Sequence, residues 1–208
     1  MILPGRGVPD CPTAVGYTAS PMETFLIATG VVALAEIGDK TQLLALILSA
    51  RFRQPLPIVF GILAATVANH ALAGVLGVWI TSLLSADTLR WLVGLSFIAM
   101  AAWTLIPDQV DDEESTRSGH GVFITTLIAF FLAEIGDKTQ VATVLLAAKY
   151  QALFAVVAGT TLGMMIADVP AVLIGDRVAR GLPTRAIHGI AAALFAVLGI
   201  AALIGVDL

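Results

Sequence analysis

The octapeptide AEIGDKTQ occurs twice in this chain of 208 residues, at Ala35–Gln42 and again at Ala133–Gln140. The two copies are identical and lie 98 residues apart, and chance agreement over eight positions is negligible. The same offset maps the regularly spaced small residues of one apolar segment, 61–77, onto small residues of another, 159–175. The chain therefore consists of two related halves, and the four-residue spacing of the small side chains is typical of a packing seam between membrane helices.

The composition around the octapeptides is that of a protein embedded in lipid. Hydrophobic residues make up 58% of the chain and charged residues only 12%, about half the charged share of a soluble domain. Gln54–Ala86 and Ala186–Val206 contain no charged residue, and each is long enough to cross a bilayer as a helix. The net charge of −4 and the absence of a basic stripe exclude nucleic acid as a partner. A single cysteine, Cys11, excludes an internal disulfide framework and a cysteine metal cluster.

We predict an all-α integral membrane protein with six transmembrane helices, arranged as two inverted three-helix repeats. Three helices per half is an odd number, so the second copy must enter the membrane from the opposite side. Prolines and charge clusters divide the apolar segments at 24–50, 56–82, 89–106, 121–148, 152–175 and 186–206.

The predicted organisation is a disordered tail over 1–21, a first repeat over 22–106, an acidic connector over 107–120 and a second repeat over 121–208. Six Lys and Arg residues fall on one side of this topology and three on the other. Because positive residues favour the cytoplasmic side, both termini are expected outside and the connector in the cytoplasm. The two groups are Arg51, Arg53, Arg117, Arg177, Arg180 and Arg185 against Arg6, Arg90 and Lys149.

Each octapeptide places two acids and a lysine near the centre of a predicted apolar helix. An ionised group there costs at least a few kcal/mol unless it is paired, hydrated or bound to an ion. On an ideal helix the three side chains share one face, and an inverted repeat would bring both sets together. The residues concerned are Glu36, Asp39 and Lys40 in the first copy and Glu134, Asp137 and Lys138 in the second.

Four carboxylates with two lysines leave a formal charge of −2, which a divalent cation would neutralise. All the candidate ligands are oxygen atoms, which suit Ca²⁺, Mg²⁺ and Mn²⁺, whereas Zn²⁺ and copper sites favour Cys and His. Burial beside other acids favours the protonated form of Glu36 and Glu134, so exchange of protons for a cation is expected. Lys40 and Lys138 are predicted to act as movable counter-charges.

Further polar residues of the apolar segments are candidates to extend this site. Gln42 and Gln140 offer amide oxygens, and Asn69 and Asp168 are an amide and an acid inside predicted helices. Asp168 corresponds to His70 under the 98-residue offset, and we interpret His70 as a hydrogen-bonded core residue. Two roles stay open for Gly38 and Gly136, close approach of a partner helix or local unwinding that frees carbonyl oxygens.

Several alternatives compete with a cation site. Glu36–Lys40 and Glu134–Lys138 could be self-neutralised i,i+4 pairs that only fix helix register. Asp39 and Asp137 could form the dyad of an intramembrane aspartyl protease, although a lysine after each acid would disturb it. An exporter of small organic solutes is a third reading, and a membrane scaffold that binds partners through Asp112–Glu114 is a fourth.

The duplicated motif Glu-aliphatic-Gly-Asp-Lys-Thr, at residues 36–41 and 134–139, resembles the signature of a family of small membrane cation exporters. These are the Golgi manganese and calcium transporters of eukaryotes and their bacterial and chloroplast relatives. The resemblance implies a transporter without a resident cofactor that exports Mn²⁺, with Ca²⁺ as a possible second substrate, in exchange for H⁺. It also implies that Glu36, Asp39, Glu134 and Asp137 are the cation ligands. The short chain fits a member in a bacterial plasma membrane.

Overall fold

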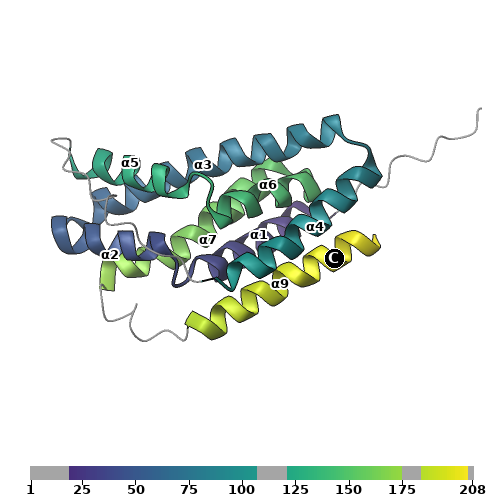
Figure 1. The fold of residues 1–208 in the computed structure, drawn as a ribbon. Coiled ribbons are helices and arrows are strands. Elements are labelled where there is room, and N and C mark those ends of the chain that lie inside the picture. The colour runs from purple at the N-terminus through teal and green to yellow at the C-terminus, as the bar shows by residue number, and fades with distance from the viewer. Residues whose placement is uncertain (1–18, 107–120, 175–183, 206–208) are drawn as a thin grey trace, which may run out of the picture.

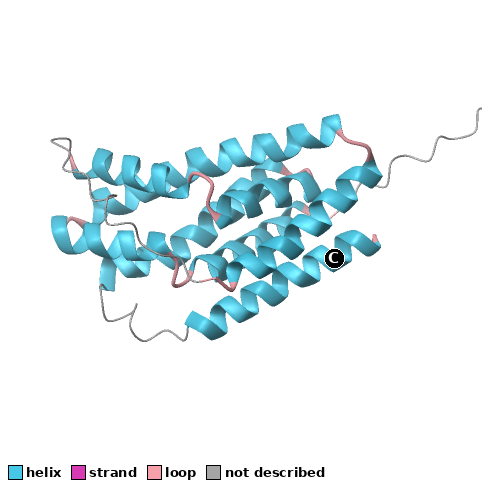
Figure 2. Cartoon of the chain, viewed as in Figure 1, coloured by secondary structure: helices cyan, strands magenta, loops and turns pink. Residues whose placement is uncertain are grey.

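The computed structural model of the chain describes residues 19–106, 121–174 and 184–205, and these residues form α-helices and no strand (Figures 1 and 2). The predicted tail up to residue 18 and the acidic connector 107–120 lie outside the described residues. The helices are α1 (Pro21–Glu36), α2 (Lys40–Phe52), α3 (Pro55–Leu83), α4 (Ala86–Thr104), α5 (Val122–Glu134), α6 (Lys138–Tyr150), α7 (Leu153–Ile174) and α9 (Thr184–Ile204).

The duplication of the sequence is present in the helix boundaries. Helices α6, α7 and α9 begin 98 residues after α2, α3 and α4, and α5 ends 98 residues after α1. Helices α3, α4, α7 and α9 agree with the predicted segments within three residues at each end. At 29 residues, α3 is about 43 Å long. Two helical spans, Pro55–Leu83 and Leu153–Leu173, are individually long and apolar enough to cross a membrane.

The two helices predicted to be continuous over 24–50 and 121–148 are each broken inside the octapeptide. In the first copy α1 ends at Glu36 and α2 begins at Lys40, and the second copy repeats this interruption. Gly38 and Gly136 have φ angles of +86° and +78°, a left-handed conformation that glycine adopts without steric cost. Of the two roles left open for these glycines, local unwinding is therefore present. The interruption also corrects the ideal-helix placement of the acids and lysines on one face.

The two halves pack by exchanging equivalent contacts. Helix α1 lies along α7, and its counterpart α5 lies along α3. A Cβ atom on Gly159 would lie 2.5 Å from Phe25 O, and one on Gly61 would lie 2.9 Å from Phe123 O. Phe123 follows Phe25 by 98 residues, as Gly159 follows Gly61. Both glycines are needed because a side chain would overlap a backbone carbonyl of the opposite half.

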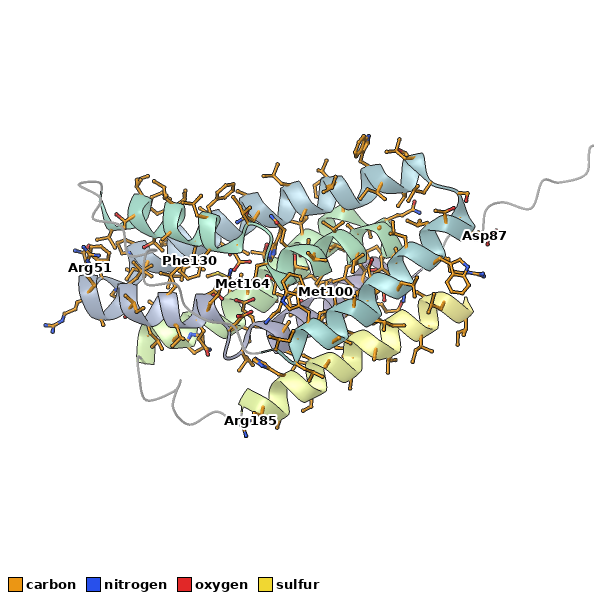
Figure 3. The ribbon with its side chains drawn as sticks, in the orientation of Figure 1. Arg51, Asp87, Met100, Phe130, Met164 and Arg185 are labelled. Carbon is orange, nitrogen blue, oxygen red and sulfur yellow. The ribbon has the colours of Figure 1, made fainter. Side chains whose placement is uncertain are left out.

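The buried side chains form two separate clusters, and the halves of each broken helix are divided between them. One cluster contains residues of α1, α4, α6 and α9, and the other contains residues of α2, α3 and α5. Figure 3 shows Met100, Met164 and Phe130 among the interior side chains. Large apolar side chains such as Leu72, Trp79 and Phe154 are instead exposed on the outside, as expected for a surface that faces lipid.

Candidate functional site

The two helix breaks bring four acids of the octapeptides to helix ends. Glu36 and Glu134 are the last residues of α1 and α5, and Asp39 and Asp137 are the N-caps of α2 and α6. All four side chains are buried. An acid at a helix N-terminus is favoured by the helix dipole, whereas one at a C-terminus adds to its negative end. Two such C-terminal ends therefore create a region that attracts a cation.

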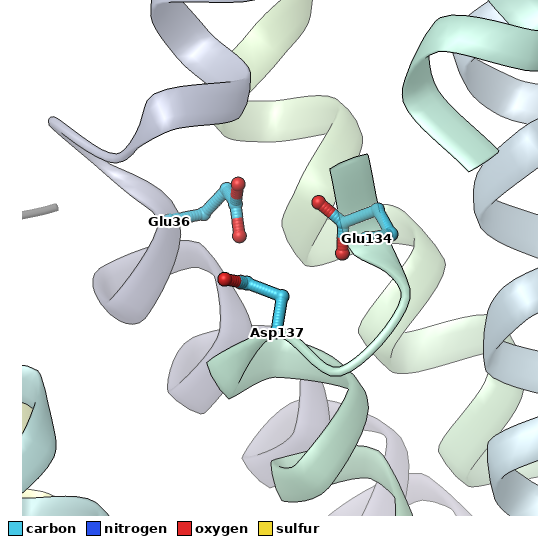
Figure 4. A group of neighbouring side chains, drawn as sticks. All are labelled: Glu36, Glu134 and Asp137. Carbon is cyan, nitrogen blue, oxygen red and sulfur yellow. The ribbon is translucent and has the colours of Figure 1, made fainter. Parts of the chain in front are cut away.

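Three of these acids point at a common space. Glu36, Glu134 and Asp137 each offer a carboxylate oxygen, and the three oxygens lie within 4.8 Å of one another (Figure 4). Oxygen ligands lie about 2.0–2.6 Å from Mg²⁺ or Ca²⁺, so two ligands of one ion are up to about 5 Å apart. The spacing of the three oxygens thus fits one hard divalent cation. Asp39, which is buried at the first break with Glu36, is not one of the three.

A threonine after each break orients the glutamate before it. The hydroxyl of Thr41 donates a hydrogen bond to Oε1 of Glu36, and that of Thr139 donates to Oε2 of Glu134 at 2.9 Å. Within the described residues, the second oxygen of each glutamate is buried and accepts no hydrogen bond. A continuous helix would direct these threonines away from the glutamates, and the break explains why they face them. Each glutamate is thus fixed on one side and open to a ligand on the other.

The two lysines have different partners. Lys40 Nζ lies 3.3 Å from Oδ1 of Asp137, so this ion pair joins the first break to the second. The predicted alternative of a self-neutralised Glu36–Lys40 pair is wrong, because the interruption of the helix removes the i,i+4 relation. Lys138 is 2% exposed, and its Nζ donates to Ile106 O at 3.3 Å. The second lysine therefore binds the chain just after α4.

Gln42 and Gln140 support the backbone of the breaks. Their Oε1 atoms accept hydrogen bonds from the N–H groups of Gly38 at 3.0 Å and Gly136 at 2.7 Å. Gln42 also donates to Ala167 O on α7 at 3.1 Å. In this structure the two amide oxygens hold the turns beside the acids.

Asp168 is the additional acid of α7. Its side chain is fully buried, and within the described residues neither carboxylate oxygen accepts a hydrogen bond. It lies close enough to Glu36 and Glu134 to interact electrostatically with both. Asp168 thus lies within electrostatic range of Glu36 and Glu134 but is not one of the three gathered acids.

Two polar residues of α3 have different surroundings. Asn69 donates to Phe131 O at 3.1 Å, one helical turn before Glu134. His70 is fully buried, and neither ring nitrogen forms a hydrogen bond within the described residues. Our interpretation of His70 as a hydrogen-bonded residue is therefore wrong, although its place in the core is confirmed. Burying the imidazole without a hydrogen-bond partner costs free energy, and the contacts of His70 do not indicate a role that would offset this cost.

Sequence reasoning missed one residue at the first break, His188 of α9. Its Nε2 atom lies 2.9 Å from Ile37 O, between Glu36 and Gly38. The two residues are 151 positions apart, and no motif or spacing marks His188. Only the packing of α9 against α1 brings them together.

Comparison with known proteins finds relatives that match over most of the chain. Residues 24–112 and 122–207 match the family model described as "Divalent cation/proton antiporter GDT1". A Vibrio cholerae protein named "Putative manganese exporter" is 50% identical over 202 residues, covering 97% of this chain and 98% of that protein. A GDT1-like protein of Synechocystis is 29% identical over 184 residues, covering 79% and 88% of the two chains.

A rice protein, GDT1-like protein 3, is more distant, at 26% identity over 83% of this chain and 71% of its own length. No solved structure matches the chain. The family match covers both halves of the duplication and both octapeptides, together with the broken helices that hold the gathered acids. The chain therefore belongs to the GDT1 family of divalent cation/proton antiporters.

Proposed function

We propose that this protein exports Mn²⁺ from the cytoplasm in exchange for H⁺, with Ca²⁺ as a second substrate. The observation that carries the proposal is the buried group of Glu36, Glu134 and Asp137, whose oxygens have the spacing of cation ligands. The name of the Vibrio relative supports Mn²⁺ as the first ion to test. Membership of a transporter family removes the protease reading of Asp39 and Asp137.

The proposed mechanism is alternating access around this site. Mn²⁺ from the cytoplasm binds Glu36, Asp39, Glu134 and Asp137, and the two halves then move against each other to open the site outward. Protonation of Glu36 and Glu134 removes two negative charges, which releases the ion. Both proton-carrying groups lie at helix ends, where a small backbone movement changes the distance between them. The transported cation is the substrate, and the mechanism needs no resident cofactor.

Lys40 is proposed to take the place of part of the cation charge when the site is empty. The three gathered acids carry −3 when ionised, and the amine beside Asp137 reduces this to −2. A divalent cation would complete the neutralisation, after which Lys40 competes with the ion for the same carboxylate. Lys138 has the equivalent role in the proposal, with Ile106 O as its partner in the present state.

Asp168 is proposed as an accessory acid that extends the site toward α7. It is buried next to the gathered acids and its oxygens are open to a ligand within the described residues. Asn69, Gln42 and Gln140 are proposed to contribute amide oxygens when the breaks rearrange. Asp168→Asn should weaken Mn²⁺ binding without abolishing it, because the three gathered acids remain.

The proposed topology has six membrane crossings in two inverted repeats, with α1–α2 and α5–α6 each forming one broken crossing. The exchanged contacts of Gly61 and Gly159 support this symmetry. Arg51 and Arg185 lie toward one end of the bundle, opposite Asp87 (Figure 3), which supports a cytoplasmic side at that end and both termini outside. A bacterial plasma membrane is the proposed location, and the bacterial source of the Vibrio relative supports it.

The test is transport by purified full-length protein in liposomes with an imposed pH gradient. Wild type should move Mn²⁺ when the gradient is applied, and Ca²⁺ should compete better than Mg²⁺ or Zn²⁺. Glu36→Gln should abolish this movement, whereas Asp87→Asn, an exposed acid of α4, should not. If folded wild-type protein moved no divalent cation, the solute-exporter and scaffold readings would replace this one. Gradient-independent Mn²⁺ movement would contradict the coupling to H⁺.

A further inference from the structure

The hydrogen bond between His188 and Ile37 joins the beginning of α9 to the first helix break. Its length is 2.9 Å, and because a carbonyl only accepts, Nε2 must carry the hydrogen. Ile37 is the C-cap of α1 with φ −64° and ψ 117°, and its neighbours are Glu36 and the left-handed Gly38. The imidazole therefore holds the backbone that connects a gathered acid to the turn.

Helix α9 and its repeat counterpart α4 form a close pair. A Cβ atom on Gly94 would lie 3.1 Å from Gly199 O, so the two backbones touch. The rings of Phe97 and Phe195 stack with their centroids 6.1 Å apart. Such close packing lets the pair move as one body, because both backbone and side-chain contacts hold the two helices together.

This pair covers only one half of the core. It packs on α1 and α6, whereas among the described residues it makes no more than isolated contacts with α2 and α5 (Figure 1). Under the 98-residue offset, the contact of α1 with α9 corresponds to a contact of α5 with α4, and within the described part of the chain α4 and α5 make at most isolated contacts. The position of the pair thus departs from the equivalence of the two halves.

The polar contacts of the pair with the breaks also differ between the halves. His188 binds the first break through α9, and Ile106, directly after α4, binds Lys138 of the second. The residue 98 positions before His188 is Arg90, which is exposed. The imidazole of His188 is therefore one feature that distinguishes the first break from the second.

We propose that His188 is a positioning residue for transport, which holds the α4–α9 pair against the first break while the three acids are gathered. The hydrogen bond opens when the pair moves toward α2 and α5, which are the repeat counterparts of α6 and α1. This inference rests on the proposed function, because it assigns a step of the same transport cycle. Loss of the bond favours states in which the acids are apart, so the apparent KM for Mn²⁺ rises.

The experiment compares full-length wild type with His188→Ala, His188→Gln and Arg90→Ala. Glutamine keeps an N–H donor of similar reach, and Arg90 is the matched position of the other half. Amide hydrogen exchange over 38–42 is measured together with Mn²⁺ flux as a function of concentration. A typical net hydrogen bond corresponds to about a five-fold change in an equilibrium.

His188→Ala should therefore speed exchange over 38–42 and raise the KM for Mn²⁺, each by about five-fold, while the maximal rate stays within about two-fold. His188→Gln should restore both values, and Arg90→Ala should change neither. Unchanged exchange or KM in His188→Ala, failure of the glutamine variant, or an equal effect of Arg90→Ala would each overturn the inference. Absence of flux in wild type would overturn the proposed function itself, and the exchange data would still show whether the bond forms.

Discussion

Lys40 of the first octapeptide lies 3.3 Å from Asp137 of the second, so the two copies of one motif are joined by an ion pair between unlike residues. Asp137 is also one of the three acids gathered around the candidate cation position. The amine is 26% exposed and the carboxylate 4% exposed, so the lysine approaches from the more open side. The carboxylate of Asp137 thus forms an ion pair with Lys40 and, in our proposal, also binds the transported ion.

Replacing Lys40 by methionine should tighten Mn²⁺ binding by at least about five-fold, since a competing unit charge leaves the site. Release should become slower for the same reason, and the maximal flux should fall. Calorimetric or fluorescence titration of the purified protein measures the affinity. Lys149→Met, on α6 but away from the gathered acids, is the control. Equal or weaker binding in the Lys40 variant would argue against competition.

Mn²⁺ affinity should fall as the pH is lowered. Protonation neutralises carboxylates, so each proton bound to Glu36 or Glu134 removes charge that attracts the ion. Glu36→Gln and Glu134→Gln should each reduce flux by at least about 100-fold, equivalent to about 2.7 kcal/mol, and Asp39→Asn should mainly weaken affinity. Binding isotherms across a pH series provide the check. A pH-independent affinity would contradict competition between protons and the cation.

Alanine at Gly38 or Gly136 should destabilise the protein by about 1–2 kcal/mol, because the left-handed φ angles of +86° and +78° disfavour a Cβ atom. Flux should also fall as the breaks change shape. Gly30→Ala is a matched control inside α1, since a Cβ atom there meets nothing within 4 Å. It should be neutral or stabilising by up to about 1 kcal/mol. Unfolding in detergent measures both, and equal effects at the three positions would refute the role of the turns.

Alanine at Gly61 or Gly159 should cost about 1–3 kcal/mol, since the added methyl group overlaps a carbonyl of the opposite half. Similar losses at both positions are expected because they occupy equivalent contacts. Gly189→Ala on α9, where a Cβ atom has open space, provides the reference. Thermal unfolding of the three variants decides the matter. Stability at the wild-type level for the Gly159 variant would show that these helices do not pack as closely as described.

Sequence alone predicted the long helices and the repeat because both depend on local pattern. The charge-free runs Gln54–Ala86 and Ala186–Val206 indicate helices α3 and α9, and the 98-residue offset predicts the paired boundaries. The breaks at Gly38 and Gly136 were only one of two options, because a glycine inside an apolar helix is compatible with continuous packing as well as unwinding.

The contacts across the site join residues that are far apart in the sequence, so they depend on the tertiary structure. The sequence predicted that all four acids of the octapeptides would meet, and the structure gathers Glu36, Glu134 and Asp137 without Asp39. The partner of Lys40 was not predicted, because an ideal helix offered Glu36, four residues away, only as an alternative and no local pattern points to Asp137. His188 carried no signal at all, because its contact is a backbone carbonyl, which every residue has.

The exchanged packing of α1 on α7 and of α5 on α3 has a consequence for biogenesis. While the first four helices leave the ribosome, the surface of α3 at Gly61 has no α5 to pack against, and α1 has no α7. Neither half can complete its interior alone, so lipid must occupy these surfaces until the second half is inserted. Each half depends on the other for its packing. If the chain is divided within 107–120, the two fragments should accumulate in the membrane only when they are expressed in the same cell.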